Sequence, residues 1–530
     1  MRSRVFQRLP IVIVLGFLAS GSLPAAAPAA SCEALARVEL PDTTITATAI
    51  PAGDFSPPEG ASIHGLPAFC RVSGVIKPSS DSNIQFEVWM PSSGWNGKLE
   101  GIGNGGFAGA IGFSEMGVAV AHGYATAATD TGHVAGATNA SWAVGHPQKV
   151  IDFGYRGIHE TAAKAKALIA RFYGDGPKHS YFNSCSNGGR EALMEAQRYP
   201  ADYDGIIAGA PAYYWTHLLT GSLWNAQAML FDTANYIPAS KLPALEAATL
   251  AACDAVDGVK DGVIDDPTKC HFDPSKLLCS GPDSDTCLTA PQVAGLQMIY
   301  SGPRNSKGVT VFPGYSPGGE TGGNGWPLWT TGPGPQKSLG FAFGTQFFAN
   351  MVYENAAWDF RTFTVDRDMK AADDKLAKAL NATDPDLKRF QARGGKLIVY
   401  HGWSDAAVPP VSSIDYYQEV VAKVGAKESE GFLRLYMVPG MQHCGGGPGP
   451  NVFGAGSVPL GDAQHDAGRA LERWVEDGVA PDQIIATRFK TGTNPASGVV
   501  RTRPLCPYPQ VAHWKGTGST DDAANFVCGK

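Results

Sequence analysis

The sequence predicts an α/β fold in which a parallel sheet, covered by helices on both faces, is interrupted by a large inserted domain. Three observations predict it. Apolar runs alternate with helical stretches from Ile84 to about Pro211, the alternation stops between Ala212 and Gly394, and it then resumes. Strand–helix alternation is typical of parallel sheets packed between helices. We therefore assign residues 31–211 and 395–530 to a sheet domain and residues 212–394 to an inserted domain.

The segments of the sheet domain follow in chain order. The runs "IQFEVWM" and "GVAVAHGYATAA" predict strands, and "RGIHETAAKAKALIARFY" has the apolar spacing of a helix. Next come the predicted strand "HSYFNSC", the helix "GGREALMEAQRY" and the strand "DGIIAGAP". After the insertion, the strands "GGKLIVYHGWSD" and "GFLRLYMVPG" precede the helix "DAGRALERWVEDG".

The inserted stretch is too long for a loop. It is rich in glycine, proline and aromatic residues and contains four cysteines. Its large aromatic residues argue against a disordered insert. They include Trp224, Trp326, Trp329, Phe347, Phe348 and Trp358. We interpret the stretch as a second domain that acts as a lid.

The N-terminus predicts export. Three early arginines are followed by an apolar run from Ile11 to Leu18 and by small residues that allow cleavage after Ala27 or Ala30. This is the pattern of a signal peptide over residues 1–30, with no membrane anchor after cleavage. The mature protein is then secreted or periplasmic. A net charge of -7 offers no basic surface for nucleic acid.

Ser186, in "YFNSCSNGGREALMEAQRYP", is the candidate nucleophile. The segment has the strand, tight turn and helix of a nucleophile elbow, whose motif is G-x-S-x-G. Ser184 takes the first glycine position as a small stand-in, and Gly188 takes the second. The N–H of Asn187 would face the developing oxyanion. A serine that only caps the helix is the alternative.

A second segment, "GYSPG" at residues 314–318, matches the whole motif but is rejected. The residue after the nucleophile must donate its backbone N–H to the oxyanion. Here that residue is Pro317, which has no N–H. Ser316 is therefore not expected to be catalytic.

The remaining catalytic groups are expected after later strands. The serine needs a base and an acid, and in the α/β-hydrolase fold they follow in the order Ser, Asp or Glu, His. Asp405 and His443 come just past two predicted strands, where such sites assemble. Gly105 or Gly106, in "LEGIGNGGFAGA", would give the second oxyanion N–H. A turn-capping aspartate, a loop histidine and a flexible glycine turn are the alternatives.

The ten cysteines favour disulfides, because an even count in an exported protein is typical of them. Zinc is disfavoured because the chain has no C-x-x-C pair. Cys185 adjoins Ser186, and Cys444 adjoins His443. If the triad forms, these two cysteines come close and should pair, which would hold nucleophile and base in register.

These features resemble the tannase and feruloyl esterase family, which also includes mono(2-hydroxyethyl) terephthalate hydrolase. The matching segments are "GNGGFAG", "CSNGGR", "CDAVDGVKDGVIDDP", "HGWSD" and "GMQHC". The resemblance implies an α/β-hydrolase fold with a large inserted lid domain, with Ser186 as nucleophile, Asp405 as acid and His443 as base. It also implies five disulfides: Cys185–Cys444, Cys32–Cys70, Cys253–Cys270, Cys279–Cys287 and Cys506–Cys528.

An acidic loop, "CDAVDGVKDGVIDDP", is a candidate calcium site. It contains Asp254, Asp257 and Asp261, and hard oxygen ligands suit Ca²⁺. No glutamate completes an EF-hand, and the spacing alone fits a solvated acidic turn equally well. The resemblance implies a structural Ca²⁺ in the lid domain, held by these aspartates and the backbone carbonyls of Val259 and Val263.

The function that follows is hydrolysis of esters of aromatic acids such as ferulate or gallate. The substrate is a small aromatic ester, and attachment to plant polysaccharide or polyphenol is compatible with it. In the terephthalate hydrolase of the family, a lid arginine is associated with the terephthalate carboxylate. No arginine lies between Arg304 and Arg361 here, which favours an uncharged phenolic acyl group. A terephthalate-type esterase, a serine peptidase and a non-catalytic binding module are the alternatives.

Overall fold

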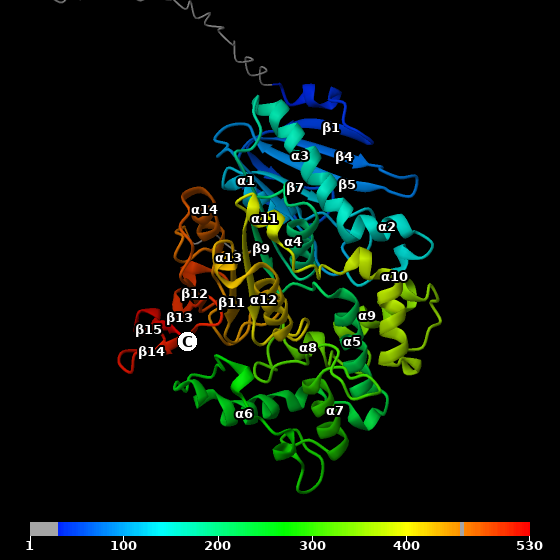
Figure 1. Ribbon diagram of the computed structural model, residues 1–530, viewed down its shortest axis with the longest axis vertical. Coiled ribbons are helices and arrows are strands. Elements are labelled where there is room, and N and C mark those ends of the chain that lie inside the picture. Colours follow the sequence, from blue (N-terminus) through cyan, green and yellow to red (C-terminus); the bar gives the residue numbers. More distant parts are fainter. Residues whose placement is uncertain (1–29, 456–460) are drawn as a thin grey trace, which may run out of the picture.

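A computed structural model describes residues 30–455 and 461–530. The predicted signal peptide lies outside the described residues, except for Ala30. Nine strands form one twisted sheet that runs through the upper and middle parts of the molecule (Figure 1). In spatial order they are β1 (Thr43–Ile50), β4 (Phe69–Ile76), β5 (Ile84–Pro91), β7 (Ala125–Thr129), β6 (Lys98–Ile102), β8 (His179–Cys185), β9 (Gly205–Gly209), β10 (Lys396–Gly402) and β11 (Leu433–Val438).

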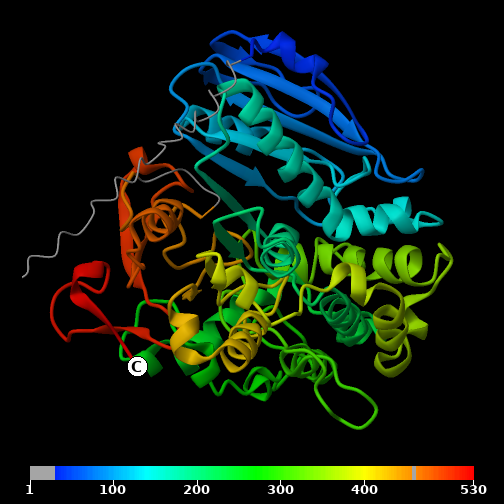
Figure 2. The same cartoon turned by 45° about the horizontal axis from the view of Figure 1, so that its top comes forward.

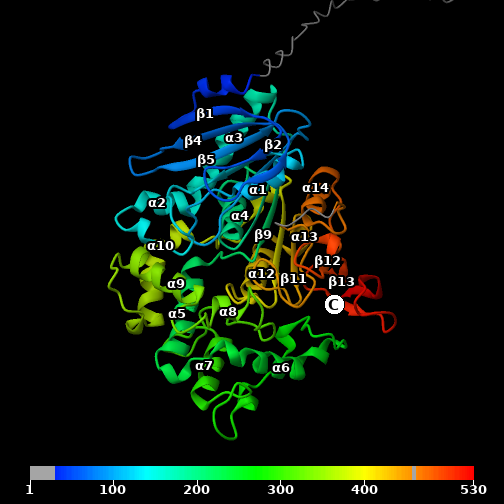
Figure 3. The ribbon, with the colours of Figure 1, turned by 180° about the vertical axis from the view of Figure 1, so that it is seen from behind.

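The sheet is mostly parallel, as predicted, but one end is antiparallel. Strands β7, β6, β8, β9, β10 and β11 pair in parallel. Strands β1, β4 and β5 pair antiparallel, and β5 also runs antiparallel to β7. These three strands lie together at the blue end of the molecule (Figure 3). The predicted strand "IQFEVWM" is confirmed as β5. The alternation pattern did not locate β1 and β4, because strands joined by a hairpin have no helix between them.

Alternate residues of the central strands point to opposite faces of the sheet. In β9, Ile206 packs in a core with α4, whereas Ile207 packs in another core with α14. In β10, Leu397 packs in the first of these cores and Ile398 in the second. A strand buried on both faces reads as a continuous apolar run, which is why the sequence located both strands.

Helices on the two faces complete this part of the fold (Figure 2). They are α1 (Phe113–Ala121), α2 (Pro147–Ile151), α3 (Gly157–Tyr173), α4 (Asn187–Arg198), α12 (Val411–Val424), α13 (Ala426–Glu430) and α14 (Ala467–Asp477). The prediction of a strand over "GVAVAHGYATAA" was wrong in its first half, which ends α1. Only the second half is strand β7. Short apolar runs fit a buried helix and a buried strand equally well.

The chain leaves the sheet after β9 and returns in the neighbouring strand β10. The segment between them is helical and lies mainly at the lower end of the molecule (Figure 1). Its helices are α5 (Trp215–Leu230), α6 (Leu242–Cys253), α7 (Ala290–Ser301), α8 (Trp326–Trp329), α9 (Leu339–Gln346), α10 (Lys370–Leu380) and α11 (Lys388–Ala392). Its core is continuous with residues from the sheet part, including Phe107 and Phe153.

Three small strand pairs lie outside the main sheet. They are β2 (Gly53–Phe55) with β3 (Ile63–Leu66), β12 (Ile484–Phe489) with β13 (Val499–Leu505), and β14 (Val511–Trp514) with β15 (Phe526–Gly529). The Cys506–Cys528 bond, hereafter the C-terminal disulfide, ties the last pair to the chain that precedes it. Among the described helices, none is both long and apolar enough to cross a membrane.

Candidate active site

Ser186 lies at a tight turn between β8 and α4. Its φ of 67° and ψ of -122° are unusual for a residue with a side chain, and such strain is typical of functional turns. Backbone bonds hold the turn in place. The Ser186 N–H donates to the Gly209 carbonyl at 2.9 Å, and the Ser186 carbonyl accepts from Ala212 at 3.1 Å. The strand–turn–helix order predicted from the sequence is therefore confirmed.

Ser184 explains the departure from the usual motif. A Cβ added to Gly188 would lie 1.9 Å from the Ser184 Oγ and 2.6 Å from its Cβ. The space that a side chain at position 188 would need is therefore filled by the side chain at 184. A Cβ on Gly103, in the preceding loop, would also lie 2.7 Å from the Ser184 Oγ. The elbow tolerates Ser184 because its neighbours at 103 and 188 are glycines.

The structure brings Ser186, His443 and Asp405 into one hydrogen-bonded chain. The His443 Nε2 lies 2.9 Å from the Ser186 Oγ, and its Nδ1 lies 2.8 Å from the Asp405 Oδ2. A carboxylate only accepts hydrogen bonds, so the proton of neutral His443 is on Nδ1 and Nε2 is free to accept from the serine. This is the arrangement that activates a serine for attack on a carbonyl carbon.

Asp405 is buried and held by several donors. Its Oδ1 accepts the backbone N–H groups of Ala407 at 2.7 Å and Val408 at 2.9 Å. Its Oδ2 also accepts from the His401 Nε2 at 3.2 Å. Burial alone would raise the Asp405 pKa. The charge of His443 and the hydrogen bonds from both histidines outweigh burial, so the pKa lies below its ordinary value.

Sequence reasoning missed His401, although it lies within the quoted segment "HGWSD". Its side chain is fully buried. The His401 Nε2 contacts the carbonyl of Val408 at 3.0 Å as well as Asp405, and its Nδ1 lies 2.7 Å from the Ser413 Oγ. A carbonyl only accepts, so Nε2 carries the proton and donates to Asp405. His401 therefore fixes the orientation of the carboxylate that contacts His443.

Both glycines proposed for the oxyanion hole remain available. In the loop after β6, the Phe107 N–H donates to Ala137 at 2.7 Å, and the Ala108 N–H donates to the Gly105 carbonyl at 2.9 Å. None of the described residues accepts a hydrogen bond from the N–H of Gly105 or Gly106. The N–H of Asn187, the first residue of α4, has no partner within its helix, as at every helix start. The candidate donors thus come from two separate elements.

The Cys185–Cys444 disulfide joins the elbow to the histidine loop, with a Cα–Cα distance of 6.0 Å. All ten cysteines are paired. The other four bonds are the pairs that the family resemblance implied. Ser186 and His443 are each one residue from the same covalent link.

Aromatic residues of the inserted segment form an apolar wall beside His443. The ring of Trp329 packs edge-on against His443, with centroids 4.8 Å apart. Phe343 stacks on Trp329 with centroids 5.9 Å apart, and it lies 5.3 Å from the Phe107 ring. A Cβ on Gly106 would come within 3.0 Å of Phe343. The wall therefore reaches from His443 to the loop that carries Gly105 and Gly106.

The acidic loop after α6 is closed by its own backbone. Asp254 accepts the N–H of Asp261 at 3.1 Å, Asp257 accepts that of Val259 at 2.8 Å, and Asp261 accepts that of Val263 at 3.1 Å. These are the residues predicted to hold calcium. Their carboxylate oxygens do not all lie within 4.8 Å of one another in the described chain, so the loop is wider than a closed coordination sphere.

Two arginines balance part of the negative charge of this loop. Asp261 forms ion pairs with Arg503 and with Arg501, the latter at 3.2 Å. Asp265 forms an ion pair with Arg503 at 3.1 Å. The Asp265 Oδ1 is buried and has no hydrogen-bond partner among the described residues. Neither Asp254 nor Asp257 forms an ion pair with these arginines, and all four aspartates offer hard oxygen atoms. The donor chemistry fits Ca²⁺.

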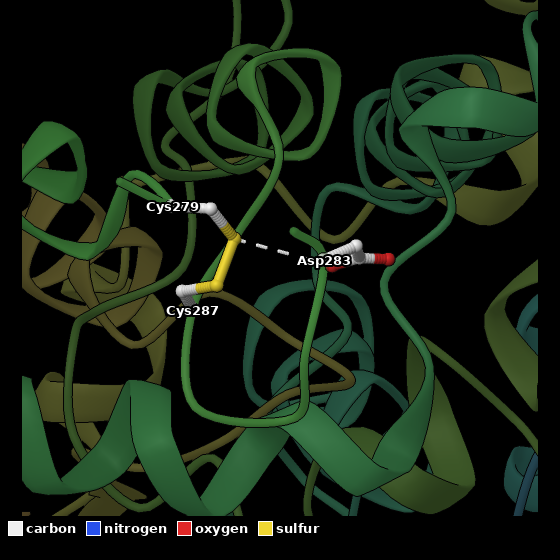
Figure 4. Close-up of side chains that lie close together, drawn as sticks. All are labelled: Cys279, Asp283 and Cys287. Atoms are coloured by element: carbon white, nitrogen blue, oxygen red, sulfur yellow. Dashed lines mark hydrogen bonds between the residues drawn. A yellow bond between two sulfur atoms is a disulfide. The ribbon is translucent and has the colours of Figure 1, made fainter. Parts of the chain in front are cut away.

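Two other groups of three side chains bring possible ligand atoms within 4.8 Å among the described residues. They are Cys279–Asp283–Cys287 and His159–Glu195–Asp202. In the first group the two sulfurs are bonded to each other (Figure 4), so neither is a thiolate ligand. In the second, burial and then the Asp202 charge raise the pKa of Glu195 well above its ordinary value. A Glu195 that keeps its proton carries no charge and does not favour a metal ion there.

Comparison with known proteins agrees with the fold. A family model described as tannase and feruloyl esterase matches residues 70–529. An uncharacterized esterase of Xanthomonas campestris pv. campestris is 46% identical, covering 96% of this chain and 92% of the relative. Mono(2-hydroxyethyl) terephthalate hydrolase of Piscinibacter sakaiensis is 35% identical, covering 89% and 86%. The crystal structure of feruloyl esterase B from Aspergillus oryzae superposes with a TM-score of 0.85 at 31% identity, covering 94% and 99%.

The mostly parallel sheet and these relatives place the protein among the carboxylic ester hydrolases of α/β fold. More narrowly, the chain belongs to the tannase and feruloyl esterase family. The resemblance found in the sequence is thereby confirmed.

Proposed function

We propose that this protein is a secreted serine esterase that hydrolyses esters of aromatic, uncharged phenolic acids through an acyl-enzyme. The observation that carries the proposal is the continuous hydrogen-bonded chain from Ser186 through His443 to Asp405, located at the strained elbow. Five disulfides support export, because such bonds persist in oxidising compartments.

Each residue has a defined step in the reaction. The Ser186 Oγ attacks the ester carbonyl carbon while the His443 Nε2 takes its proton. Negative charge develops on the former carbonyl oxygen and is met by the N–H groups of Asn187 and of Gly106 or Gly105. His443 then gives its proton to the departing alcohol. Water repeats the sequence on the acyl-enzyme, which releases the acid and restores the serine.

The aromatic wall supports an aromatic acyl group. Trp329 and Phe343 can cover a flat ring whose carbonyl carbon lies over Ser186, because both stand beside the catalytic groups. Such surfaces bind rings by apolar burial and stacking. We propose that the inserted segment acts as a lid that supplies this surface. The absence of arginine between Arg304 and Arg361 favours an uncharged ring over a terephthalate.

Two assays test the proposal. The protein should hydrolyse methyl ferulate or methyl gallate faster than mono(2-hydroxyethyl) terephthalate and should not cleave a peptide panel. A fluorophosphonate should label Ser186 and not Ser316, as mass spectrometry of the labelled peptide would show. Label on Ser316, or no hydrolysis of any ester by the wild type, would contradict the assignment.

We further propose that the acidic loop holds a structural Ca²⁺. The side chains of Asp254, Asp257 and Asp261 and the carbonyls of Val259 and Val263 would hold it, and the ion would offset the excess negative charge there. A ligand that binds only the folded state raises its stability, so a chelator should lower the melting temperature and Ca²⁺ should restore it. An unchanged melting curve, with no calcium by elemental analysis, would reject the site.

A further inference from the structure

Glu191 is a buried carboxylate that the reaction described above does not use. It lies on α4, one turn after Asn187, and its exposed fraction is 1%. Burial, opposed by the nearby Arg190 charge, raises its pKa to about 7. A carboxylate so far from water is costly to keep, so its hydrogen bonds need an explanation.

The two oxygens of Glu191 contact the two arms of the candidate oxyanion hole. Oε2 accepts the backbone N–H of Asn104 at 2.9 Å, directly before Gly105 and Gly106. Oε1 accepts from the side-chain amide of Asn187 at 2.9 Å. Asn187 is the residue whose backbone N–H forms the other arm. One side chain thus joins a loop and a helix that are otherwise separate in the chain.

The surrounding residues fix this bridge from both sides. The Arg190 Nε donates to the Asn187 Oδ1 at 2.8 Å, so the Asn187 side chain can turn only its NH₂ group to Glu191. A Cβ on Gly103 would lie 2.7 Å from the Glu191 Oε2. The loop therefore approaches the carboxylate closely only because residue 103 is a glycine.

We propose that Glu191 is a positioning residue that holds the two arms of the oxyanion hole at the separation the transition state requires. This inference rests on the proposed function. Oxyanion donors act on charge that exists only in the transition state. Loss of the bridge should therefore lower kcat and leave substrate binding nearly unchanged.

The test compares Glu191→Gln and Glu191→Asp with a matched control, Glu195→Gln. In Glu191→Gln, one carboxylate oxygen becomes an NH₂ group, which cannot accept from the N–H donor that faces it. One of the two hydrogen bonds is therefore lost. The aspartate keeps the charge but is too short to reach the loop. Glu195 lies one turn further along α4 and is equally buried, but its carboxylate has no hydrogen-bond partner in the described chain. It reports the effect of replacing a buried glutamate on this helix when no hydrogen bond is lost.

Three quantities are measured at pH 8, above the pKa of about 7 for Glu191: kcat and KM on methyl ferulate, the affinity for trifluoroacetophenone, and inhibition by ferulic acid. The ketone forms a tetrahedral adduct whose oxyanion needs the hole, whereas the product acid does not. Both Glu191 variants should lose kcat and ketone affinity together, by about tenfold to a hundredfold, the scale of a misplacement near 1 Å. KM and ferulic acid inhibition should change less than about twofold, and the control should match wild type.

Wild-type kcat and ketone affinity in folded Glu191 variants would overturn the inference, as would an equal loss in the control. If neither Glu191 variant folds, hydrogen exchange of backbone amides in the wild type tests the bridge instead. The Asn104 N–H must then exchange slowly, and fast exchange rejects the bridge. A wild type that neither hydrolyses the ester nor binds the ketone contradicts the proposed function itself. An active wild type with equally active Glu191 variants contradicts only the role of Glu191.

Discussion

Replacing Gly188 by alanine should stop catalysis by moving the elbow. The new Cβ would lie 1.9 Å from the Ser184 Oγ, whereas ordinary contact begins at 3.4 Å, so the two atoms must separate by 3.4 − 1.9 = 1.5 Å. A different rotamer of Ser184 does not remove the clash, because its Cβ would still be 2.6 Å away. Position 184 lies two residues before the nucleophile and position 188 two residues after it. The displacement therefore falls on Ser186.

The expected loss is large. A misplacement near 1 Å costs about a hundredfold in rate, or about 2.7 kcal/mol of activation free energy. We expect kcat of Gly188→Ala on an aryl ester to fall at least that far. Circular dichroism should show a folded protein, since overpacking costs about 1–3 kcal/mol.

A second substitution isolates the cause. Ser184→Gly in the Gly188→Ala background removes both clashing atoms, and the nearest remaining atom is the Asn104 carbonyl oxygen at 3.2 Å. The double variant should regain activity to within about tenfold of wild type, the contact at 3.2 Å being only slightly tight. Ser184→Gly alone should be close to wild type. Full activity in Gly188→Ala, or a double variant as poor as the single one, would refute the steric explanation.

Three further predictions concern the same site. Replacing Cys185 and Cys444 together by alanine should lower kcat at temperatures where the protein stays folded, whereas removing the C-terminal disulfide should affect only stability; equal kcat in the two variants would contradict a positioning role. His401→Phe removes a hydrogen bond to the charged Asp405 and should lower kcat about tenfold. His401→Gln, which can still donate to Asp405, should restore part of that loss. An unchanged kcat in His401→Phe would contradict a role of His401 in orienting Asp405. Because the folded pKa of Asp405 is below its ordinary value of about 3.9, its ionisation stabilises the fold above that pH, and this contribution is lost as the pH falls further. The melting temperature should therefore fall less steeply below pH 4 in Asp405→Asn than in wild type. Parallel curves of melting temperature against pH for the two proteins would contradict this prediction.

Features encoded within a short stretch of chain could be predicted from the sequence. The elbow, the strands before Asp405 and His443, and the order of the three residues follow from local apolar patterns and chain order. The rejection of Ser316 needed only the missing N–H of the following proline. The family resemblance supplied the cysteine pairs, which spacing alone left open.

Other features depend on which atoms of distant segments meet, and a sequence does not state those distances. Only the tertiary structure showed that Ser184 fits because residues 103 and 188 are glycines. Only the structure assigned Glu191 and His401 their partners, since a buried glutamate or histidine reads in the sequence like any other polar residue. The antiparallel end of the sheet was also decided at this level. Strand pairing is a contact between segments, whereas the pattern within each strand is local.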